Sequence, residues 1–453
     1  MTRRALVVSN DHIGSSMAGP GIRSYRFAEA LLGDFDAVTL AVPFETDLVD
    51  DRLEIVVTTL WDPASTLSLV EGYDTVVAQR LPIPTMRALT RRRTRVIYDL
   101  YAPLLLEQLA LEARERPTRE RLVLARLNEL TETVALQTGD AFVCASEKQR
   151  DFWLGCLGGL GRLRAELYAR DPSLRSLIDV VPFGLDVEPP RPGPAMRGVV
   201  GGIGDSARIL LWPGGVWNWL DPLTVIRAVA TLSDRRPDVH LYFLGLRHPN
   251  PGVEEMSMAR EAVALAEELG VRDRSVHFNV GWVPFGERGR YLLDADLAVS
   301  AHFDDVESRF AFRTRLLDCL WAGLPVVTTQ GDALGELLVE AGAGRAVGYG
   351  DVDAWVETLE ELVDDSAARE RAAAAAAALR SRFEWPRVVR PLRTLCDPEA
   401  AAGGADPGLR IGAAYARLRL RLALDRQGVA RASASAALRA AATLRKQIST
   451  RVR

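Results

Sequence analysis

Short apolar runs rich in β-branched residues alternate with amphipathic segments through most of the 453-residue chain. Residues 4–10, RALVVSN, have the composition of a strand that ends in a polar, glycine-bearing loop, and residues 25–32, YRFAEALL, place apolar side chains at helical spacing. Further strand-like runs follow at DAVTLAVP, YDTVVAQR, TRVIYDLYAP and DAFVCAS. Strands that alternate with helices predict a parallel sheet with right-handed crossovers.

Two segments of the first half have helix signals of their own. Residues 104–138 are rich in Leu, Glu and Arg and are interrupted by RPTRE, which predicts two consecutive helices. Ser146 and Gln149 form a capping-box pattern, so another helix should begin directly after the strand DAFVCAS.

A proline-rich segment, LDVEPPRPGP, interrupts the alternation and marks a domain boundary near residues 185–206. The pattern restarts with ARILLWPGG and continues to DAWVETLEELV. The sequence therefore predicts an α/β protein with two Rossmann-like doubly wound parallel-sheet domains that face a cleft. We place the domains at residues 1–190 and 207–375, joined by a linker at 191–206 and followed by a return segment at 376–398 and a basic helical tail at 399–453.

Composition narrows the class of protein. The chain is 48% hydrophobic and 26% charged, it has no apolar run of the length that a membrane-spanning helix needs, and we expect it to be cytoplasmic. Its four cysteines are scattered without a C-x-x-C pair, and its five histidines have no i, i+4 spacing, so neither a disulfide framework nor a metal site is indicated.

Charge is distributed unevenly along the chain. The net charge is −4, yet residues 401–453 alone hold eleven Arg and Lys side chains against Asp406 and Asp425. An acidic body makes nucleic acid an unexpected partner. The tail stretch RLRLRLAL alternates with period two although its residues favour helix, and Leu444, Ile448 and Val452 would share one face of a weakly amphipathic helix. A solvated or subunit-packing helix and a contact with anionic lipid are both compatible with this tail.

Ligands of open parallel sheets bind beyond the carboxyl ends of the strands, and three segments with little charge are expected at such edges. In MAGPGIR, Gly19 and Gly21 permit close backbone approach, and Arg23 lies in the first helical turn, where a cation is unfavourable unless an anion is near; a tight turn is the simpler alternative. In WPGGVWNWLDP a glycine turn is flanked by tryptophans, and GWVPFGE offers free backbone groups to a nucleobase edge. The candidate positions in these two segments are Gly214, Gly215, Trp282 and Val283.

The fourth segment, residues 310–332, carries most of the charge. Arg313 and Arg315 precede an apolar helix that contains the acid Asp318, and unpaired charges are costly to bury. Two guanidinium groups suit a diphosphate, and a carboxylate suits the vicinal hydroxyls of a ribose. Gly331 and Asp332 then precede another helix, whose first backbone N–H groups would face phosphate oxygens. An internal Arg–Asp pair is the alternative for this segment.

Several of these stretches together resemble the family-4 type of retaining glycosyltransferases with the GT-B fold, across residues 1–395. The likeness lies in GPGIR, VIYDLYAP, VVPFGLD, GWVPF, LLDCLWAGLPVV, TTQGDALGELL and FEWPRVV. The resemblance implies an enzyme that binds a nucleotide-sugar donor mainly on the second domain, and a glycan or lipid-linked acceptor on the first. It also implies glycosyl transfer with retention, without a required metal or other cofactor, in the synthesis of a cell-envelope or surface polysaccharide.

The family pattern also assigns roles to residues. Asp318 falls at the position that holds the ribose, and Glu307 is our substitute for the family's donor-sugar glutamate, whose position is occupied by Phe310. The family's Arg and Lys phosphate clamp maps onto Gly215 and Leu220 and is therefore missing.

Four residues form our catalytic set, Arg313, Arg315, Glu307 and Asp99. The two arginines would replace the missing clamp. Asp99 would orient the acceptor or the sugar, and it follows Tyr98 where many members have His-Asp.

Two other functions remain compatible with these departures. A GT-B epimerase would use the same nucleotide pocket without an acceptor. A noncatalytic nucleotide-sugar-binding protein would explain the missing clamp. A phosphorylase that anchors its cofactor by lysine is disfavoured, because Lys148 and Lys446 are the only lysines.

Overall fold

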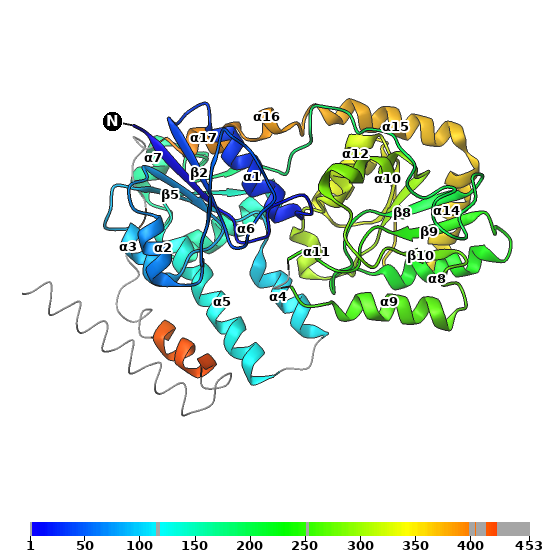
Figure 1. The fold of residues 1–453 in the computed structure, drawn as a ribbon, viewed down its shortest axis with the longest axis horizontal. Coiled ribbons are helices and arrows are strands. Elements are labelled where there is room, and N and C mark those ends of the chain that lie inside the picture. The colour runs from blue at the N-terminus through cyan, green and yellow to red at the C-terminus, as the bar shows by residue number, and fades with distance from the viewer. Residues whose placement is uncertain (1, 115–117, 251–252, 398–403, 405–413, 424–453) are drawn as a thin grey trace, which may run out of the picture.

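The computed structural model describes residues 2–114, 118–250, 253–397, 404 and 414–423, and these form two α/β lobes side by side (Figure 1). The first lobe is built on a seven-stranded sheet in the order β3-β2-β1-β4-β5-β6-β7, with all neighbouring strands parallel. Its strands are β1 (Arg4–Val8), β2 (Ala37–Val42), β3 (Glu54–Val57), β4 (Thr75–Ala78), β5 (Arg95–Asp99), β6 (Ala141–Cys144) and β7 (Ile178–Val180).

Seven helices of the first lobe connect these strands. They are α1 (Gly19–Leu31), α2 (Pro63–Leu69), α3 (Ile83–Leu89), α4 (Leu104–Ala113), α5 (Arg119–Thr138), α6 (Glu147–Gly159) and α7 (Ala165–Arg170). The two consecutive helices predicted after β5 are α4 and α5. Ser146 caps α6 as predicted, because its Oγ accepts from the backbone N–H of Gln149 at 3.2 Å. The return bond differs from a capping box, since the Gln149 side chain accepts from Ala145 N at 2.8 Å, one residue before the N-cap.

The second lobe repeats the arrangement with a six-stranded parallel sheet in the order β10-β9-β8-β11-β12-β13. Its strands are β8 (Arg208–Trp212), β9 (Val239–Phe243), β10 (Val276–Phe278), β11 (Leu297–Ser300), β12 (Val326–Thr329) and β13 (Gly344–Val347). Its helices are α8 (Pro222–Ser233), α9 (Ser257–Glu268), the 3₁₀ turn η1 (Phe285–Glu287), α10 (Arg288–Leu293), α11 (Val306–Phe310), α12 (Arg315–Ala322), α13 (Ala333–Glu340), α14 (Val352–Asp364) and α15 (Ser366–Arg380).

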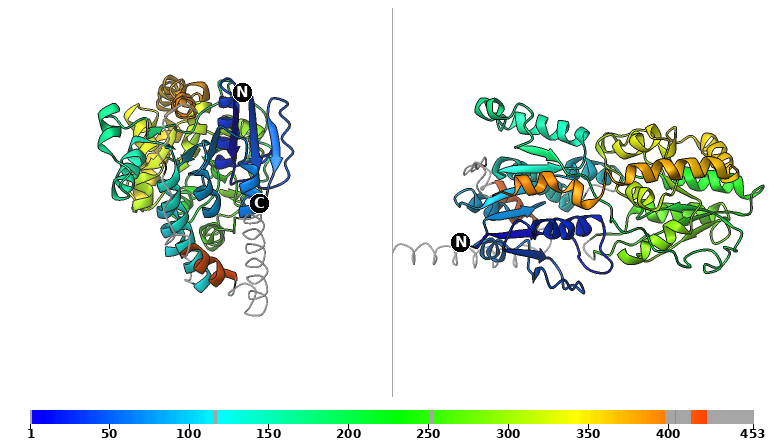
Figure 2. Two further views of the ribbon diagram at one scale, coloured as in Figure 1. Left: turned by 90° about the vertical axis from the view of Figure 1, so that its left-hand side faces the viewer. Right: turned by 90° about the horizontal axis from the view of Figure 1, so that it is seen from above.

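The chain crosses between the lobes twice, and the two crossings run together. Leu185 N donates to Phe383 O at 2.7 Å, and Trp385 N donates to Leu185 O at 3.1 Å. After α15, the short helices α16 (Trp385–Val388) and α17 (Arg390–Leu395) pack back on the first lobe, as the view from above shows (Figure 2). A single cluster of buried apolar residues continues from the first sheet through this crossing into the second domain, so the lobes share part of their core.

The structure confirms the predicted fold class of two doubly wound parallel-sheet domains. It adds the four-residue edge strand β3, which the sequence analysis did not include although Ile55, Val56 and Val57 are β-branched. Residues 414–423 of the tail are helical, with Leu422 buried and Tyr415 packed on the first domain. The predicted amphipathic face of Leu444, Ile448 and Val452 lies outside the described residues. No helix in the described part of the chain is long and apolar enough to cross a membrane.

Candidate active site

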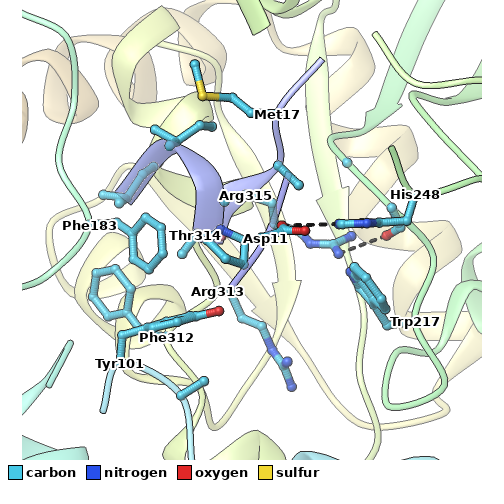
Figure 3. A pocket seen from close by; sticks show the side chains of 18 of the residues that line it. Asp11, Met17, Tyr101, Phe183, Trp217, His248, Phe312, Arg313, Thr314 and Arg315 are labelled. Carbon is cyan, nitrogen blue, oxygen red and sulfur yellow. Dashed lines mark hydrogen bonds and ion pairs between the residues drawn. The ribbon is translucent and has the colours of Figure 1, made fainter. Parts of the chain in front are cut away.

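A cavity of about 480 Å³ lies between the two lobes and is lined by residues of both. Figure 3 shows Tyr101 and Phe183 on one side and Trp217 and His248 on the other, with Arg313 and Arg315 between them. Nine of the fourteen residues predicted for the site line this cavity. They are Gly19, Gly214, Gly215, Trp282, Val283, Glu307, Arg313, Arg315 and Asp318.

The first arginine of the charged segment is already paired inside the protein. Arg313 Nη1 and Nη2 donate to the two carboxylate oxygens of Glu307 at 3.0 and 2.6 Å, and Nη2 also donates to Ser308 Oγ at 3.0 Å. Both side chains are more than nine-tenths buried. Such a pair fixes the position of both groups at the cavity wall, but it leaves Arg313 with less capacity to neutralise a ligand's charge.

Arg315, in contrast, is a half-buried cation without such a carboxylate partner. Its Nη2 donates to the backbone carbonyl of Gly215 at 2.8 Å, and its Nη1 is buried without a hydrogen-bond partner. Among the described residues, no carboxylate lies within ion-pair distance of this guanidinium. Burial, and after it the neighbouring Arg313 charge, lowers the pKa of Arg315 to about 9, so that Arg315 remains a cation at neutral pH. An unpaired cation in a cavity wall is the arrangement expected of an anion-binding group.

Arg315 lies beside the turn where the sequence analysis found the family's phosphate clamp missing. Its guanidinium reaches the glycine turn after β8, the turn whose family clamp arginine is replaced here by Gly215, and lies 5.5 Å from the ring centre of Trp212. Figure 3 shows the guanidinium groups of Arg313 and Arg315 pointing in different directions. Positive charge is thus supplied to the turn from α12 instead of from the turn itself.

Asp318, one helical turn into α12, lies at the edge of the cavity. Arg288 Nε donates to its Oδ1 at 3.1 Å, and the Arg288 guanidinium lies 3.9 Å from the ring centre of Phe285 and 4.7 Å from that of Trp321. The Asp318 side chain is still about one third exposed. Its second oxygen remains free to accept hydrogen bonds from ligand hydroxyls.

Aromatic side chains form the second domain's wall of the cavity. The ring of Trp217 stacks on that of Trp219 with centroids 5.3 Å apart, and His248 lies between Trp217 and Trp282, 5.4 Å from each. The wall also bridges to the first domain, because Asn250 Nδ2 donates to Asp11 Oδ1 at 2.6 Å. Flat apolar faces of this kind suit a base or a sugar ring.

Arg23 and Asp99 are placed differently from the prediction. Arg23 Nε and Nη2 donate to the two oxygens of Asp99 at 2.7 and 2.8 Å, Nη1 donates to Pro182 O at 3.1 Å, and the guanidinium lies 4.4 Å from the ring centre of Phe27. The two side chains are 0% and 5% exposed, and neither lines the cavity. The arginine in the first turn of α1 is therefore neutralised by an internal carboxylate.

Three further predicted positions also lie outside the cavity lining. A side chain at Gly21 would meet the backbone oxygen of His12 at 2.3 Å, so this glycine permits close packing of the chain on itself. Gly331 has φ +112° and lies under the Tyr349 hydroxyl, and Asp332 caps α13 by accepting from Leu334 N and Gly335 N at 3.1 and 2.9 Å. The predicted phosphate contact at this helix start remains a prediction.

The cavity also contains three polar residues of the first domain that the sequence analysis missed. Gln79 and Arg80 follow β4, and Glu107 lies in the first turn of α4. Burial, together with the charge of Glu307 on the other wall, raises the pKa of Glu107 to about 7. Gln79 and Arg80 directly follow a predicted strand, which is a signal that could have identified them. Glu107 gives no such signal, because α4 has the pattern of an ordinary Leu/Glu-rich helix and its contact with α11 is not evident from the sequence.

The shifted pKa of Glu107 predicts a pH-dependent stability difference. An unfolded glutamate titrates near pH 4.3, so between about pH 4.5 and 7 the folded protein binds more protons than the unfolded chain, and the stability contributed by this group falls as pH rises. Glu107→Gln should match wild type in unfolding free energy below pH 4.5 and exceed it by roughly 1–3 kcal/mol above pH 7. Denaturant titrations at pH 4.5 and 8, with the exposed Glu357→Gln of α14 as control, would measure this; an equal difference at both pH values would contradict it.

Two parallel-sheet domains around a shared cavity define the GT-B fold, and comparisons with known proteins agree with it. The glycosyltransferase WaaG, described as involved in lipopolysaccharide biosynthesis, is 17% identical with a TM-score of 0.61 and covers 88% of this chain and 100% of its own. Anabaena Alr3699/HepE, solved in complex with UDP-glucose, is 16% identical with a TM-score of 0.61 and covers 86% of this chain and 99% of its own.

At the level of sequence, residues 207–365 match the family model described as Glycosyl transferases group 1. The D-inositol 3-phosphate glycosyltransferase of Corynebacterium urealyticum is 29% identical over 227 residues, which are 49% of this chain and 51% of that protein. The chain thus spans about half the length of the curated relatives it matches. The resemblance to GT-B glycosyltransferases is confirmed, and the second domain carries the group 1 family segment.

Proposed function

We propose that this protein is a retaining glycosyltransferase that moves a sugar from a nucleotide-sugar donor to a glycan, lipid-linked or small-molecule acceptor, in cell-envelope or surface polysaccharide synthesis. The observation that carries the proposal is Arg315, which lies in the segment that matches the group 1 family model, lines the interdomain cavity and has no carboxylate within ion-pair distance among the described residues. HepE, a neighbour of the same fold, binds UDP and UDP-glucose, which makes a uridine diphosphate sugar the first donor to test.

In this proposal each group has a role in the transfer. Breaking the bond between sugar and diphosphate leaves negative charge on the leaving group, and a fixed cation in a water-poor cavity lowers that barrier. Arg315 would meet the diphosphate over the Gly214–Gly215 turn. Asp318 would accept from the ribose hydroxyls, and Glu307, held by Arg313, would accept from the donor sugar. No covalent nucleophile and no metal ion is part of this proposal.

Nucleotide binding tests the donor half of the proposal directly. UDP, GDP, dTDP and ADP, with their common sugar conjugates, should produce a base-selective increase in the unfolding temperature of wild type. Asp318→Asn should reduce that increase by weakening the ribose contact, while the exposed Glu357→Gln should leave it unchanged. EDTA should have no effect on the increase if no metal is required.

Turnover distinguishes the proposed transferase from its alternatives. A transferase should release nucleoside diphosphate from the stabilising donor, slowly to water and faster when an acceptor is supplied. A base-selective stabilisation without any release would favour the noncatalytic binding protein, and isomerised donor without release would favour an epimerase. No stabilisation by any nucleotide would reject the donor site itself.

We further propose that the basic tail holds the protein at the inner face of the cell membrane, where a lipid-linked acceptor would lie. Each Lys or Arg near an anionic surface contributes about 1 kcal/mol of attraction, and residues 401–453 carry a net charge of +9. Deletion of residues 401–453 should abolish co-sedimentation with phosphatidylglycerol vesicles at low salt. Unchanged sedimentation of the truncated protein would refute the membrane role.

A further inference from the structure

The cavity is lined by a second cation without a carboxylate partner among the described residues, the half-buried Arg80 of the first domain. Arg80 follows β4 of the first domain, and its backbone is fixed by Asn10, whose Oδ1 accepts from Arg80 N at 3.1 Å and whose Nδ2 donates to Arg80 O at 3.2 Å. The guanidinium donates from Nη1 to Asn128 Oδ1 at 3.2 Å. Both anchors are neutral amides, so they position the arginine without neutralising it.

Hydrogen-bond donors at this place lack partners. Arg80 Nε and Nε2 of the adjacent Gln79 are both buried without an acceptor among the described residues, although both residues line the cavity. A buried donor without an acceptor costs free energy, and a buried cation without a carboxylate costs more. Two neighbouring unsatisfied donors and one unpaired charge point to an acceptor-rich, negatively charged ligand.

No carboxylate among the described residues pairs directly with Arg80. None of the described acids lies within ion-pair distance of Arg80. Glu107 and Glu132, the acids that act on its charge, both have a pKa raised to about 7, chiefly by burial, so each is partly protonated at neutral pH. These acids therefore compensate the charge of Arg80 only in part, and a ligand anion could compensate the rest.

We propose that Arg80 and Gln79 form an oxyanion subsite for the acceptor, so that the substrate glycosylated by this protein carries a phosphate or carboxylate group. This inference rests on the proposed transferase function. The two unpaired guanidiniums belong to different domains: Arg315 is fixed to the donor-side turn by the Gly215 carbonyl, and Arg80 is fixed to the first domain by Asn10 and Asn128. One donor diphosphate accounts for Arg315, and Arg80 requires a second anion.

Matched pairs of charged and neutral ligands test this subsite. Calorimetry with the full chain, saturated with UDP, would compare glycerol with sn-glycerol 3-phosphate, glucose with glucose 6-phosphate and with glucuronate, and myo-inositol with a myo-inositol monophosphate. At least one charged member should bind at least 10-fold more tightly than its neutral partner. Vesicles of phosphatidylinositol in neutral lipid form a separate arm, which separates a lipid headgroup from a free anion.

Variants of Arg80 then test whether this residue causes the tighter binding of charged ligands. Arg80→Gln keeps a donor for Asn128 and removes the charge, and it should reduce affinity for the charged ligand by roughly 10- to 100-fold while leaving UDP affinity within about twofold. Arg80→Lys should recover part of the affinity. Arg92→Ala, which removes an arginine from an exposed pair with Glu71 in the same domain, is the matched control, and unfolding temperatures verify that each variant is folded.

The outcomes separate the two proposals. A preference of wild type for charged over neutral ligands that disappears in Arg80→Gln supports the subsite. This holds whether the preference is seen with the soluble ligands or with the phosphatidylinositol vesicles. Equal binding of charged and neutral ligands, binding of none of them, or loss of UDP affinity in Arg80→Gln to the degree seen in Arg315→Ala would each overturn it. Failure of wild type to bind UDP at all would instead refute the donor site, and it is measured before any acceptor is added.

Discussion

Arg315→Ala should weaken the binding of nucleoside diphosphates by about 100-fold and lower kcat/KM for glycosyl transfer by roughly 10²–10³-fold. Among the described residues no carboxylate pairs with this guanidinium, which donates only to the neutral Gly215 carbonyl, so its positive charge is available to the diphosphate. Calorimetry with UDP and initial rates of UDP release would measure the two effects. The rate should suffer more than the affinity, because the charge on the leaving group is greatest in the transition state.

Two further variants test whether the loss of UDP affinity and rate is caused by removing the positive charge of Arg315. Arg315→Lys should retain part of the affinity but lose the contact with the Gly215 carbonyl together with the planar geometry of the guanidinium. Arg313→Ala should chiefly destabilise the protein, because it leaves Glu307 buried without its partner. If Arg315→Ala bound UDP as tightly as wild type, the unpaired cation would have another purpose and the donor site would have to be sought elsewhere.

The periodic pattern of the sequence was sufficient for the architecture. Parallel strands buried on both faces appear as apolar runs between amphipathic helices, and such runs predicted both sheets except β3. That strand, Glu-Ile-Val-Val, lies at the sheet edge; its residues favour a strand, but a run of four is too short to be assigned with certainty from the pattern alone. Edge elements depend on a single neighbour, and the sequence alone does not reveal that neighbour.

The sequence identified the segments that form the site, but it did not identify which side chains contact one another there. Arg313 and Arg315 are two residues apart, and the sequence treats them as one clamp. In the fold, the first precedes α12 and reaches back six residues to Glu307, while the second reaches the turn after β8, one hundred residues away. Which arginine is paired depends on the packing of α11 and of that turn, and neither is encoded locally.

Arg23 also shows that the local sequence does not identify the partner of a charged residue. A cation in the first turn of a helix is electrostatically unfavourable, and that observation correctly indicated a nearby negative charge. The charge is the carboxylate of Asp99, 76 positions later in the chain. An internal partner and an external anion give the same local signal, and only the tertiary structure distinguishes them.

Asp99→Ala should lower the free energy of unfolding by about 3–5 kcal/mol, because it leaves the Arg23 guanidinium buried and uncompensated. The pair is joined by two hydrogen bonds of 2.7 and 2.8 Å, and the Arg23 side chain is fully buried among Phe27, Tyr101 and Phe183. Denaturant titration of the variant would measure the loss. The exposed pair of Arg235 and Glu360 is the matched control, and Glu360→Ala should leave the unfolding midpoint almost unchanged.

The same variant decides between a structural and a catalytic role for Asp99. Neither member of the pair lines the cavity, so the folded fraction of Asp99→Ala should bind UDP with nearly wild-type affinity. If Asp99 instead oriented a substrate, the variant would lose more activity than the loss of folded protein explains. The double variant Arg23→Met, Asp99→Leu should recover most of the stability, because apolar side chains of similar volume remove the unpaired charge together with the pair. If the double variant were as unstable as Asp99→Ala, burial of an unpaired guanidinium would not be the cause, and the packing around α1 would have to explain the loss.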